Sequence, residues 1–324
     1  MAIGSGLSGQ FGGKAESTYG TAVTVDRFWE FTSESIEPDV ATIDIKGIRA
    51  GSRIQRTDRT ARIVRGYAGS IELPVLNKNM GLLFQHALGG DTITTITGSA
   101  RRHTCTPDSL AQQGKMLTIQ MGKPSVDGTV QPFTYNGGKI TGFEVMCSVD
   151  EPLMATFDFD FKGATTATAL ASASYVATQE GFYWPQAAVT VAGSTFYAKG
   201  FKCKYTPNLS VDRRFLGNTK KEPLAGGFAT IEGELDAEFE SLTEYANFIA
   251  GTQQALVITF TTATFITGST PFVFKLSVPK ANWMNAAPTV GDTGILKLTL
   301  PFRGEDDGSN APITITLDNA DTSA

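Results

Sequence analysis

Hydrophobic and polar residues alternate over many short segments of this chain, and β-branched residues are frequent within them. Alternation with a period of two predicts strands that bury one face. Asn136-Gly137 is a strong signal for a tight turn between two of them. We therefore expect a mainly β protein of the β-rich α+β class, with strands at about 23–32, 61–75, 115–121, 139–148, 153–161, 187–192, 195–206, 226–239, 255–262, 271–278, 293–302 and 312–317.

Two segments of the first half recur in the second half in the same order. Residues 69–89 align with 231–251, and each reads as a strand that feeds a short helix ending at glycine. The helices are expected at about 79–88 and 241–250, with Asn79 and Ser241 accepting hydrogen bonds from their first N–H groups. Residues 157–163 align in turn with 298–304.

The two matches differ in their offset along the chain. The first offset is 231 − 69 = 162 residues and the second is 298 − 157 = 141, so the second half lacks 21 residues between its helix and its closing strand. Ordered matches of this kind indicate a duplication. We predict two similar domains, residues 1–165 and 166–324, each with one short helix and a long projecting loop, and a linker within 163–178.

Composition and charge narrow the classes of function. The 324 residues include 34 Gly, 14 Pro and 21 Phe, and only 18% are charged, which suits many strands and turns. A net charge of −5 gives no overall attraction to nucleic acid or to an anionic membrane. No apolar run approaches the roughly 18 residues of a spanning helix, and no signal peptide opens the chain. We expect no membrane partner and synthesis in the cytoplasm of the host cell.

Residue patterns for catalysis or cofactor binding are weak. The two histidines, His86 and His103, have no partner at metal-binding or catalytic spacing. The three cysteines form no C-x-x-C pair, which indicates neither a disulfide framework nor a zinc site. The glycine pattern at residues 4–9 follows no strand and so lacks a phosphate-binding scaffold. We expect no catalytic residue, no cofactor and no metal.

The most unusual local feature is a basic segment over residues 46–65. Seven cations and one aspartate, Asp58, give it a charge of 7 − 1 = +6 in a chain of −5. Cations at every third position fit neither a strand face nor a helix stripe, so the segment is expected to project as a loop. A weaker counterpart follows at residues 210–223. The cations of interest are Lys46, Arg49, Arg53, Arg56, Arg59 and Arg62 in the first loop and Arg213, Arg214, Lys220 and Lys221 in the second.

Two functions compete for the basic segment. Arginine-rich arms bind phosphate, which makes a nucleic-acid-binding module the alternative reading. Guanidinium groups also pair well with carboxylates on another copy of the same chain. The interleaved aromatic residues of a base-stacking surface are absent and the rest of the chain is acidic, so self-assembly is favoured.

Acidic residues alternate with apolar ones in two of the predicted strands. The alternation places one set of side chains in the core and the carboxylates on a solvated face. If such a sheet lines a channel, its carboxylates repel DNA phosphates. The candidate lumen-facing residues are Asp158, Asp160, Glu234, Asp236 and Glu238.

The segment from Lys14 to Ser35 carries a family resemblance. Its E-x-T-Y-G-T sequence, Glu16 to Thr21, resembles the opening of the tail tube (major tail) proteins of siphophages of actinobacteria. The resemblance implies a non-enzymatic virion protein with a β-sandwich, a short helix and a long loop in each domain. Inner sheets would join across neighbours into a barrel around a lumen, and the loops at 46–62 and 210–221 would stack successive rings.

The resemblance also implies partners. Because this chain is duplicated, three copies would supply six similar domains to a ring, although a ring of six copies stays open. The expected partners are the chain itself, a tape measure protein, tail terminator and tip proteins, and genome DNA in transit without specific binding.

Overall fold

The computed structural model describes residues 5–51, 53–108, 112–217, 219–290 and 293–324. Strands dominate these residues, so the predicted mainly β class is confirmed. They also contain two α-helices, α1 (Gly81–Leu88) and α2 (Thr243–Ala250), and three short 3-10 helices, Gly6–Ser8, Thr57–Arg59 and Trp184–Gln186. None of the described helices is long and apolar enough to cross a membrane.

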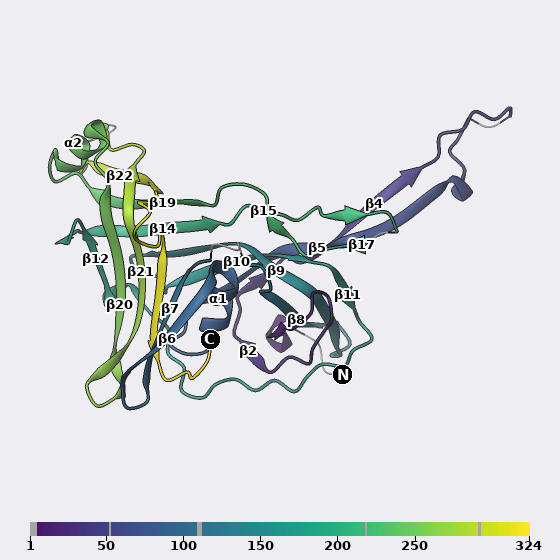
Figure 1. Ribbon diagram of the computed structural model, residues 1–324, viewed down its shortest axis with the longest axis horizontal. Helices are drawn as coiled ribbons and strands as arrows, with labels where there is room; N and C mark the ends of the chain where they lie inside the picture. Colours follow the sequence, from purple (N-terminus) through teal and green to yellow (C-terminus); the bar gives the residue numbers. More distant parts are fainter. Residues whose placement is uncertain (1–4, 52, 109–111, 218, 291–292) are drawn as a thin grey trace.

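A sheet built from both halves of the chain, here called the central sheet, runs across the molecule (Figure 1). Its order is β4-β5-β10-β9-β14-β19-β22, with every neighbouring pair antiparallel. At the junction of the halves β9 pairs with β14, and Phe143 lies opposite Tyr205. The strands are β4 (Glu37–Asp44), β5 (Thr60–Pro74), β9 (Val130–Ser148), β10 (Met154–Phe161), β14 (Ala198–Thr206), β19 (Thr230–Glu238) and β22 (Lys297–Gly304), with β3 (Ser33–Glu34) also on β5.

Each half also contributes to a second sheet. The first of these sheets has the order β2-β1-β8-β9-β11, all from the first half. The second has the order β13-β12-β20-β21-β23-β7-β6, in which β6 and β7 come from the first half. The strands of the first are β1 (Gln10–Glu16), β2 (Arg27–Trp29), β8 (Met116–Pro124) and β11 (Gly163–Thr165) with part of β9; those of the second are β6 (Gly89–Thr97), β7 (Ala100–Pro107), β12 (Ala187–Val191), β13 (Ser194–Thr195), β20 (Gln254–Thr267), β21 (Thr270–Trp283) and β23 (Thr314–Asn319).

The length difference between the halves has a structural counterpart. After α1 the chain forms the β6–β7 hairpin before it reaches β8, whereas β20 begins at Gln254, soon after α2 ends at Ala250. The hairpin pairs through β7 with β23 of the second half. In the predicted alignment, the 21 residues that the second half lacks correspond to this hairpin, which reaches across to the other half's sheet.

The Asn136-Gly137 dipeptide does not form the predicted turn. It lies inside β9, where the strand leaves its pairing with β8 and enters its pairing with β10. Gly137 has φ +63°, a backbone conformation that suits glycine, and the register with β8 shifts here. The dipeptide therefore forms a bulge that bends one long strand between two sheets.

The start of α1 also differs from the prediction. Asn79 does not accept a capping bond; its side-chain amide donates to the Phe28 carbonyl, and its own carbonyl accepts from the Trp29 indole at 2.6 Å. Ser241 matches the prediction more closely, because its hydroxyl accepts a bond from the Thr243 N–H at 3.3 Å. Tertiary contacts override the local capping preference of Asn79.

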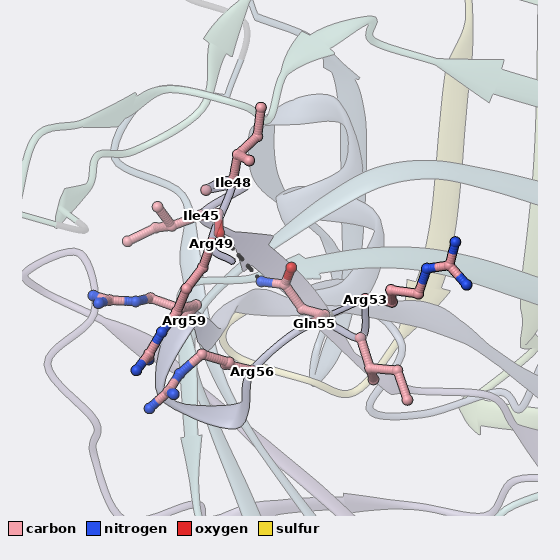
Figure 2. A pocket seen from close by; sticks show the side chains of 9 residues that line it. Ile45, Ile48, Arg49, Arg53, Gln55, Arg56 and Arg59 are labelled. Atoms are coloured by element: carbon pink, nitrogen blue, oxygen red, sulfur yellow. Dashed lines mark hydrogen bonds between the residues drawn. The ribbon is translucent and has the colours of Figure 1, made fainter. Parts of the chain in front are cut away.

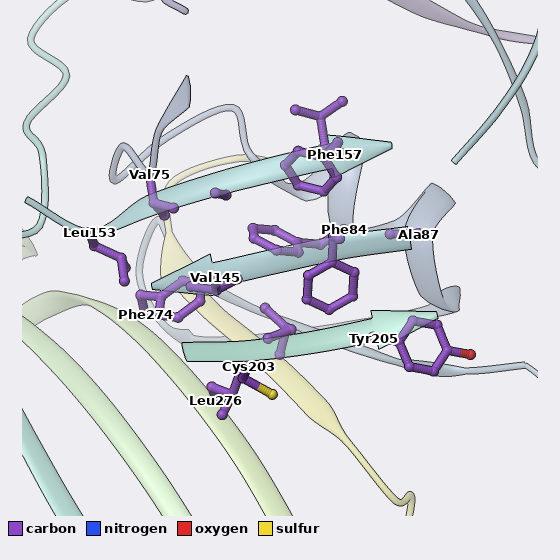
Figure 3. Packing of buried hydrophobic residues seen from close by; sticks show 14 of the residues in the cluster. Val75, Phe84, Ala87, Val145, Leu153, Phe157, Cys203, Tyr205, Phe274 and Leu276 are labelled. Atoms are coloured by element: carbon purple, nitrogen blue, oxygen red, sulfur yellow. The ribbon is translucent and has the colours of Figure 1, made fainter. Parts of the chain in front are cut away.

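The core lies between the central sheet and the second sheets, and α1 is embedded in it (Figure 3). Phe84 of α1 packs its ring against Phe143 of β9 at 5.6 Å, Phe157 of β10 at 5.3 Å and Phe274 of β21 at 5.8 Å between centroids. Burial of each such aromatic side chain contributes about 2–3 kcal/mol. Because Phe274 belongs to the second half, the helix of the first half ties the two halves together.

Candidate assembly surfaces

The basic segment forms the end of a long arm that extends beyond the body of the molecule (Figure 1). β4 and β5 form the stem of the arm, and residues 45–51 and 53–59 form its tip. The tip encloses a shallow hollow, where the Gln55 amide donates to the Ile45 carbonyl and the guanidinium groups point outward (Figure 2). All six predicted cations of the arm, Lys46, Arg49, Arg53, Arg56, Arg59 and Arg62, are exposed.

The arm also carries exposed aliphatic side chains. Ile43, Ile45, Ile48 and Ile54 are each more than half exposed. Within the tip, Arg56 forms a bidentate ion pair with Asp58 at 2.8 and 2.9 Å. Apolar and basic groups displayed together on an extended hairpin fit a protein surface better than they fit a phosphate backbone, because apolar side chains gain from burial against protein.

The second predicted loop does not project freely in the same way. Residues 207–217 and 219–229 contain two short nested strand pairings, β15 (Leu209–Ser210) with β18 (Leu224–Ala225) and, between them, β16 (Arg214–Phe215) with β17 (Thr219–Lys220). This segment, the second loop, lies against the first half. Lys220 donates to the Asp160 carboxylate at 2.7 Å and to the Phe161 carbonyl at 3.0 Å.

The Lys220–Asp160 pair corrects two expectations. Lys220 is only 4% exposed and Asp160 only 8%, so neither side chain is free at the surface of the subunit. Burial raises the pKa of Asp160 and lowers the pKa of Lys220, and their mutual contact opposes both shifts. Lys220 therefore acts within the subunit rather than in an exposed stacking loop, and Asp160 does not lie on the solvated face.

The neighbouring cations of the second loop are also engaged within the chain. Arg214 donates to the Arg65 carbonyl of β5 and lies 3.4 Å from the Asp39 carboxylate of β4. It therefore binds both strands at the base of the arm. Arg213 donates to the carbonyl of Glu222. Lys221 is exposed, with its ammonium 5.0 Å from the centre of the Phe215 ring. The second loop fastens the two halves together.

A second, partly buried ion pair supports the same junction, and no sequence pattern singled it out. Lys139 of β9 donates to the Glu222 carboxylate at 2.7 Å, and Glu222 also accepts from the Gly114 N–H at 2.8 Å. Burial lowers the pKa of Lys139. No local motif marks this pair, because its partners are distant in sequence and meet only through the fold.

Four of the five predicted acidic residues lie on the central sheet's polar face, which is the face opposite the core. Asp158, Glu234 and Glu238 are half-buried there and Asp236 is exposed. The face is more mixed than an acidic wall, because β14 places Lys202 opposite Glu234, with an ion pair at 3.2 Å, and Lys204 opposite Glu232. The signal for these lysines was present in the alternation of residues 201–205, FKCKY.

The E-x-T-Y-G-T segment has a structural role in this fold. The buried carboxylate of Glu16 accepts bonds from the Gly20 N–H at 2.9 Å, the Thr118 hydroxyl at 2.8 Å and the Gly137 N–H at 2.9 Å. Burial raises the pKa of Glu16, against the effect of these donors. Through Glu16, the segment therefore hydrogen-bonds the loop after β1 to the bend of β9 at Gly137.

The two histidines are held in structural positions. His86 lies in α1 with Nδ1 2.9 Å from the Leu82 carbonyl. His103 lies in β7, with Nδ1 3.4 Å from the Asp91 carboxylate and Nε2 3.0 Å from the Asp321 carbonyl. Within the part of the chain that the structure describes, no three His, Cys, Asp or Glu side chains gather as a metal site.

The described residues thus form a mainly β protein with a sheet shared by both halves and an exposed basic arm. The family model for the phage tail tube protein matches residues 6–304. No curated protein matches the chain. This chain therefore belongs to the phage tail tube protein family and is a structural subunit of the virion tail, which self-assembles into a tube. The comparisons give no support to the alternative of a nucleic-acid-binding module.

Proposed function

We propose that three copies of this chain close a ring of six similar lobes, and that stacked rings enclose a passage for DNA. The observation that carries the proposal is the edge-to-edge pairing of β9 with β14, which joins the halves within one chain. A heterologous contact that repeats by rotation closes into a ring. In this proposal the contact between copies repeats the contact between halves.

Matching strand orders support this assignment. The first half contributes β4-β5-β10-β9 to the central sheet and the second contributes β14-β19-β22, with the end of β21 paired to β22 at Trp283 and Phe302. In each half a strand of this sheet, β5 or β19, leads into a helix. The central sheet of each copy therefore has two outer edges, at β21–β22 and at β3–β4. In the ring, the β21–β22 edge of one copy would pair with the β3–β4 edge of the next. Their pairing would remove the exposed edges that otherwise cause aggregation.

The polar face of the central sheet would line the passage. Asp158, Glu234, Asp236 and Glu238 would repel phosphates, while the lysines of β14, already paired with carboxylates, would bind DNA weakly. Genome DNA would therefore pass without specific binding. Asp160 has no part in this lining, because it is buried with Lys220.

Stacking of rings is assigned to the arm. Its exposed arginines and isoleucines would meet an acidic and partly apolar surface on the adjacent ring. Of the second loop's cations, Lys221 is the exposed one that remains available for such a contact, whereas Lys220 and Arg214 hold the subunit together.

The remaining roles follow from this position in the tail. The subunit would be made in the host cytoplasm, would act without enzymatic activity, and would contact the tape measure protein and the terminator and tip proteins of the tail.

Assembly of the purified protein tests the proposal. Negative-stain images at rising protein concentration are expected to show rings or tubes with a central hole. A strictly monomeric protein at high concentration and low salt, with no rings or tubes, would contradict it.

A further inference from the structure

We infer that an exposed apolar stripe along α2, formed by its N-cap residue Leu242 with Tyr245 and Ile249 of the helix, docks on the first half of the next copy. This inference rests on the proposed function and deepens it by naming a contact surface between copies. The three side chains are 66%, 38% and 66% exposed, respectively. Their spacing of three and four residues places them on one face of the helix.

Comparison with α1 shows that this stripe is unusual. The offset of 162 that aligns the helices maps Met80 to Leu242, Leu83 to Tyr245 and Ala87 to Ile249. The three residues of the first half are each at most 1% exposed. Side chains at the same positions are thus fully covered at α1, whereas at α2 Leu242 and Ile249 are largely exposed and Tyr245 is partly exposed.

Strands β6, β7 and β9 of the first half pack beside α1, and part of its remaining covering comes from the second half of the same chain. The ring of Phe84 packs on Phe274 of β21. Ala324, at the chain end, lies so close to Gly81 that a Cβ added there would meet its Cα at 2.9 Å. The N–H of Asn79, just before the helix, donates to the Asp321 carboxylate at 2.7 Å. α1 therefore sits at the junction between its own half and the next.

α2 sits at the corresponding place at the far end of the chain. It lies beside β22 at the end of the molecule opposite the arm tip (Figure 1). Glu244 accepts a bond from the Trp283 indole at 2.7 Å, which fixes the helix to β21, so the stripe is held in place. If the junction between copies repeats the junction between halves, the first half of the next copy covers the stripe.

The choice of a second copy as occupant follows from continuity with the free edge of the central sheet. In the chain, α1 flanks the β9–β14 junction, because Phe84 packs on Phe143 of β9 and Phe143 lies opposite Tyr205 of β14. The helix that flanks the β21–β22 edge is α2. The β6–β7 hairpin, which packs beside α1, has no counterpart after α2, so the second half does not supply its own cover.

The test replaces the stripe with polar groups and measures assembly. Leu242→Ser/Ile249→Ser is expected to leave the melting temperature and far-UV circular dichroism of the monomer unchanged, because both side chains are already exposed. The concentration needed for assembly should rise by on the order of tenfold or more, since two apolar side chains lose their burial. The matched control is Val126→Ser, at an 83% exposed residue in the turn between β8 and β9.

A photo-crosslinker at position 245 identifies the occupant directly. In a mixture of isotopically labelled and unlabelled protein, the crosslinked peptides should join two copies and come from residues 1–165. Crosslinks confined to residues 166–324, or assembly of the double variant at the wild-type concentration, would overturn the inference. Absence of any assembly by the wild-type protein would instead contradict the proposed function, so the two failures are distinguishable.

Discussion

At the scale of single residues, the buried Lys220–Asp160 pair is the contact with the most definite energetic consequence. A buried charge left without its partner is costly, because the protein interior cannot replace the lost solvation. The pair fastens the second loop to β10, so its loss should affect the joining of the halves. Its contribution therefore belongs to folding of the subunit rather than to contacts between rings.

We predict that Lys220→Ala lowers the free energy of unfolding by about 3–5 kcal/mol, since Asp160 would remain buried alone. The control is Lys221→Ala, at an exposed residue that contacts one ring face, which should cost roughly 0.5 kcal/mol. Chemical denaturation measures both. The double variant Lys220→Met/Asp160→Leu should recover most of the loss, and equal effects of Lys220→Ala and Lys221→Ala would contradict a buried pair.

His86 predicts a pH dependence of stability. Burial lowers the pKa of His86 to about 4, from 6.5. As pH falls from 6.5 toward 4, the unfolded state takes up a proton that the folded state does not, so stability that is fully present above pH 6.5 is lost. The loss attributable to this group is roughly 3 kcal/mol by pH 4.

Denaturation of wild-type protein and His86→Gln at several pH values isolates this effect. The variant should show a shallower decline in stability between pH 6.5 and pH 4 than the wild type. The comparison with the variant is needed because Glu16 and Asp160 have raised pKa values, so their protonation increases the stability of the folded state as the pH falls. Subtracting the two curves leaves the contribution of His86. Parallel curves for the two proteins would show that His86 is not buried in its neutral form.

At the scale of elements, strands with one buried face were predictable from the sequence. β5, β10 and β19 match their predicted positions closely, because their alternation reports a core on one side. β4 and β6 were missed because most of their side chains are exposed and no alternation remains. β1 was missed because its glycines pack closely under Trp29 and Phe28, where larger side chains would clash.

The site was predictable only in part. The position of the arm follows from its charge, since seven cations in twenty residues cannot be buried. The fate of the second loop could not be predicted, because Asp160 and Asp39, which bind its cations, lie far away in the sequence. Local charge alone does not distinguish a free arm from a loop that is clamped by distant carboxylates.

The arm predicts a separation between folding and stacking. Arg53→Glu/Arg56→Glu/Arg59→Glu should leave the melting temperature of the subunit nearly unchanged, since all three side chains are exposed. Tube length in negative-stain images should fall to single or few rings, because the charge that meets the next ring is reversed.

The control for this variant replaces the same arginines with lysine. It keeps the charge and should retain most of the tube length, with a moderate loss from weaker pairing of carboxylates. Tubes of wild-type length from the charge-reversed protein would refute the stacking role of the arm.

At the scale of the whole molecule, the halves are not independent bodies. Two sheets cross between them, through β9 with β14 and through β7 with β23. Such long-range pairings leave no local signal in the sequence, because the residues of one strand do not indicate which distant strand will pair with its edge. The pairing of the halves in the fold therefore provides a model for how one copy joins the next, which the sequence repeat alone does not.

The most direct test of this account is a cryo-electron microscopy map of the assembled tube. We predict three copies in each ring, six similar lobes around the lumen, and a central sheet that continues from the β21–β22 edge of one copy to the β3–β4 edge of the next. A ring in which the central sheets end at the subunit boundaries, or in which their polar faces point away from the lumen, would contradict it.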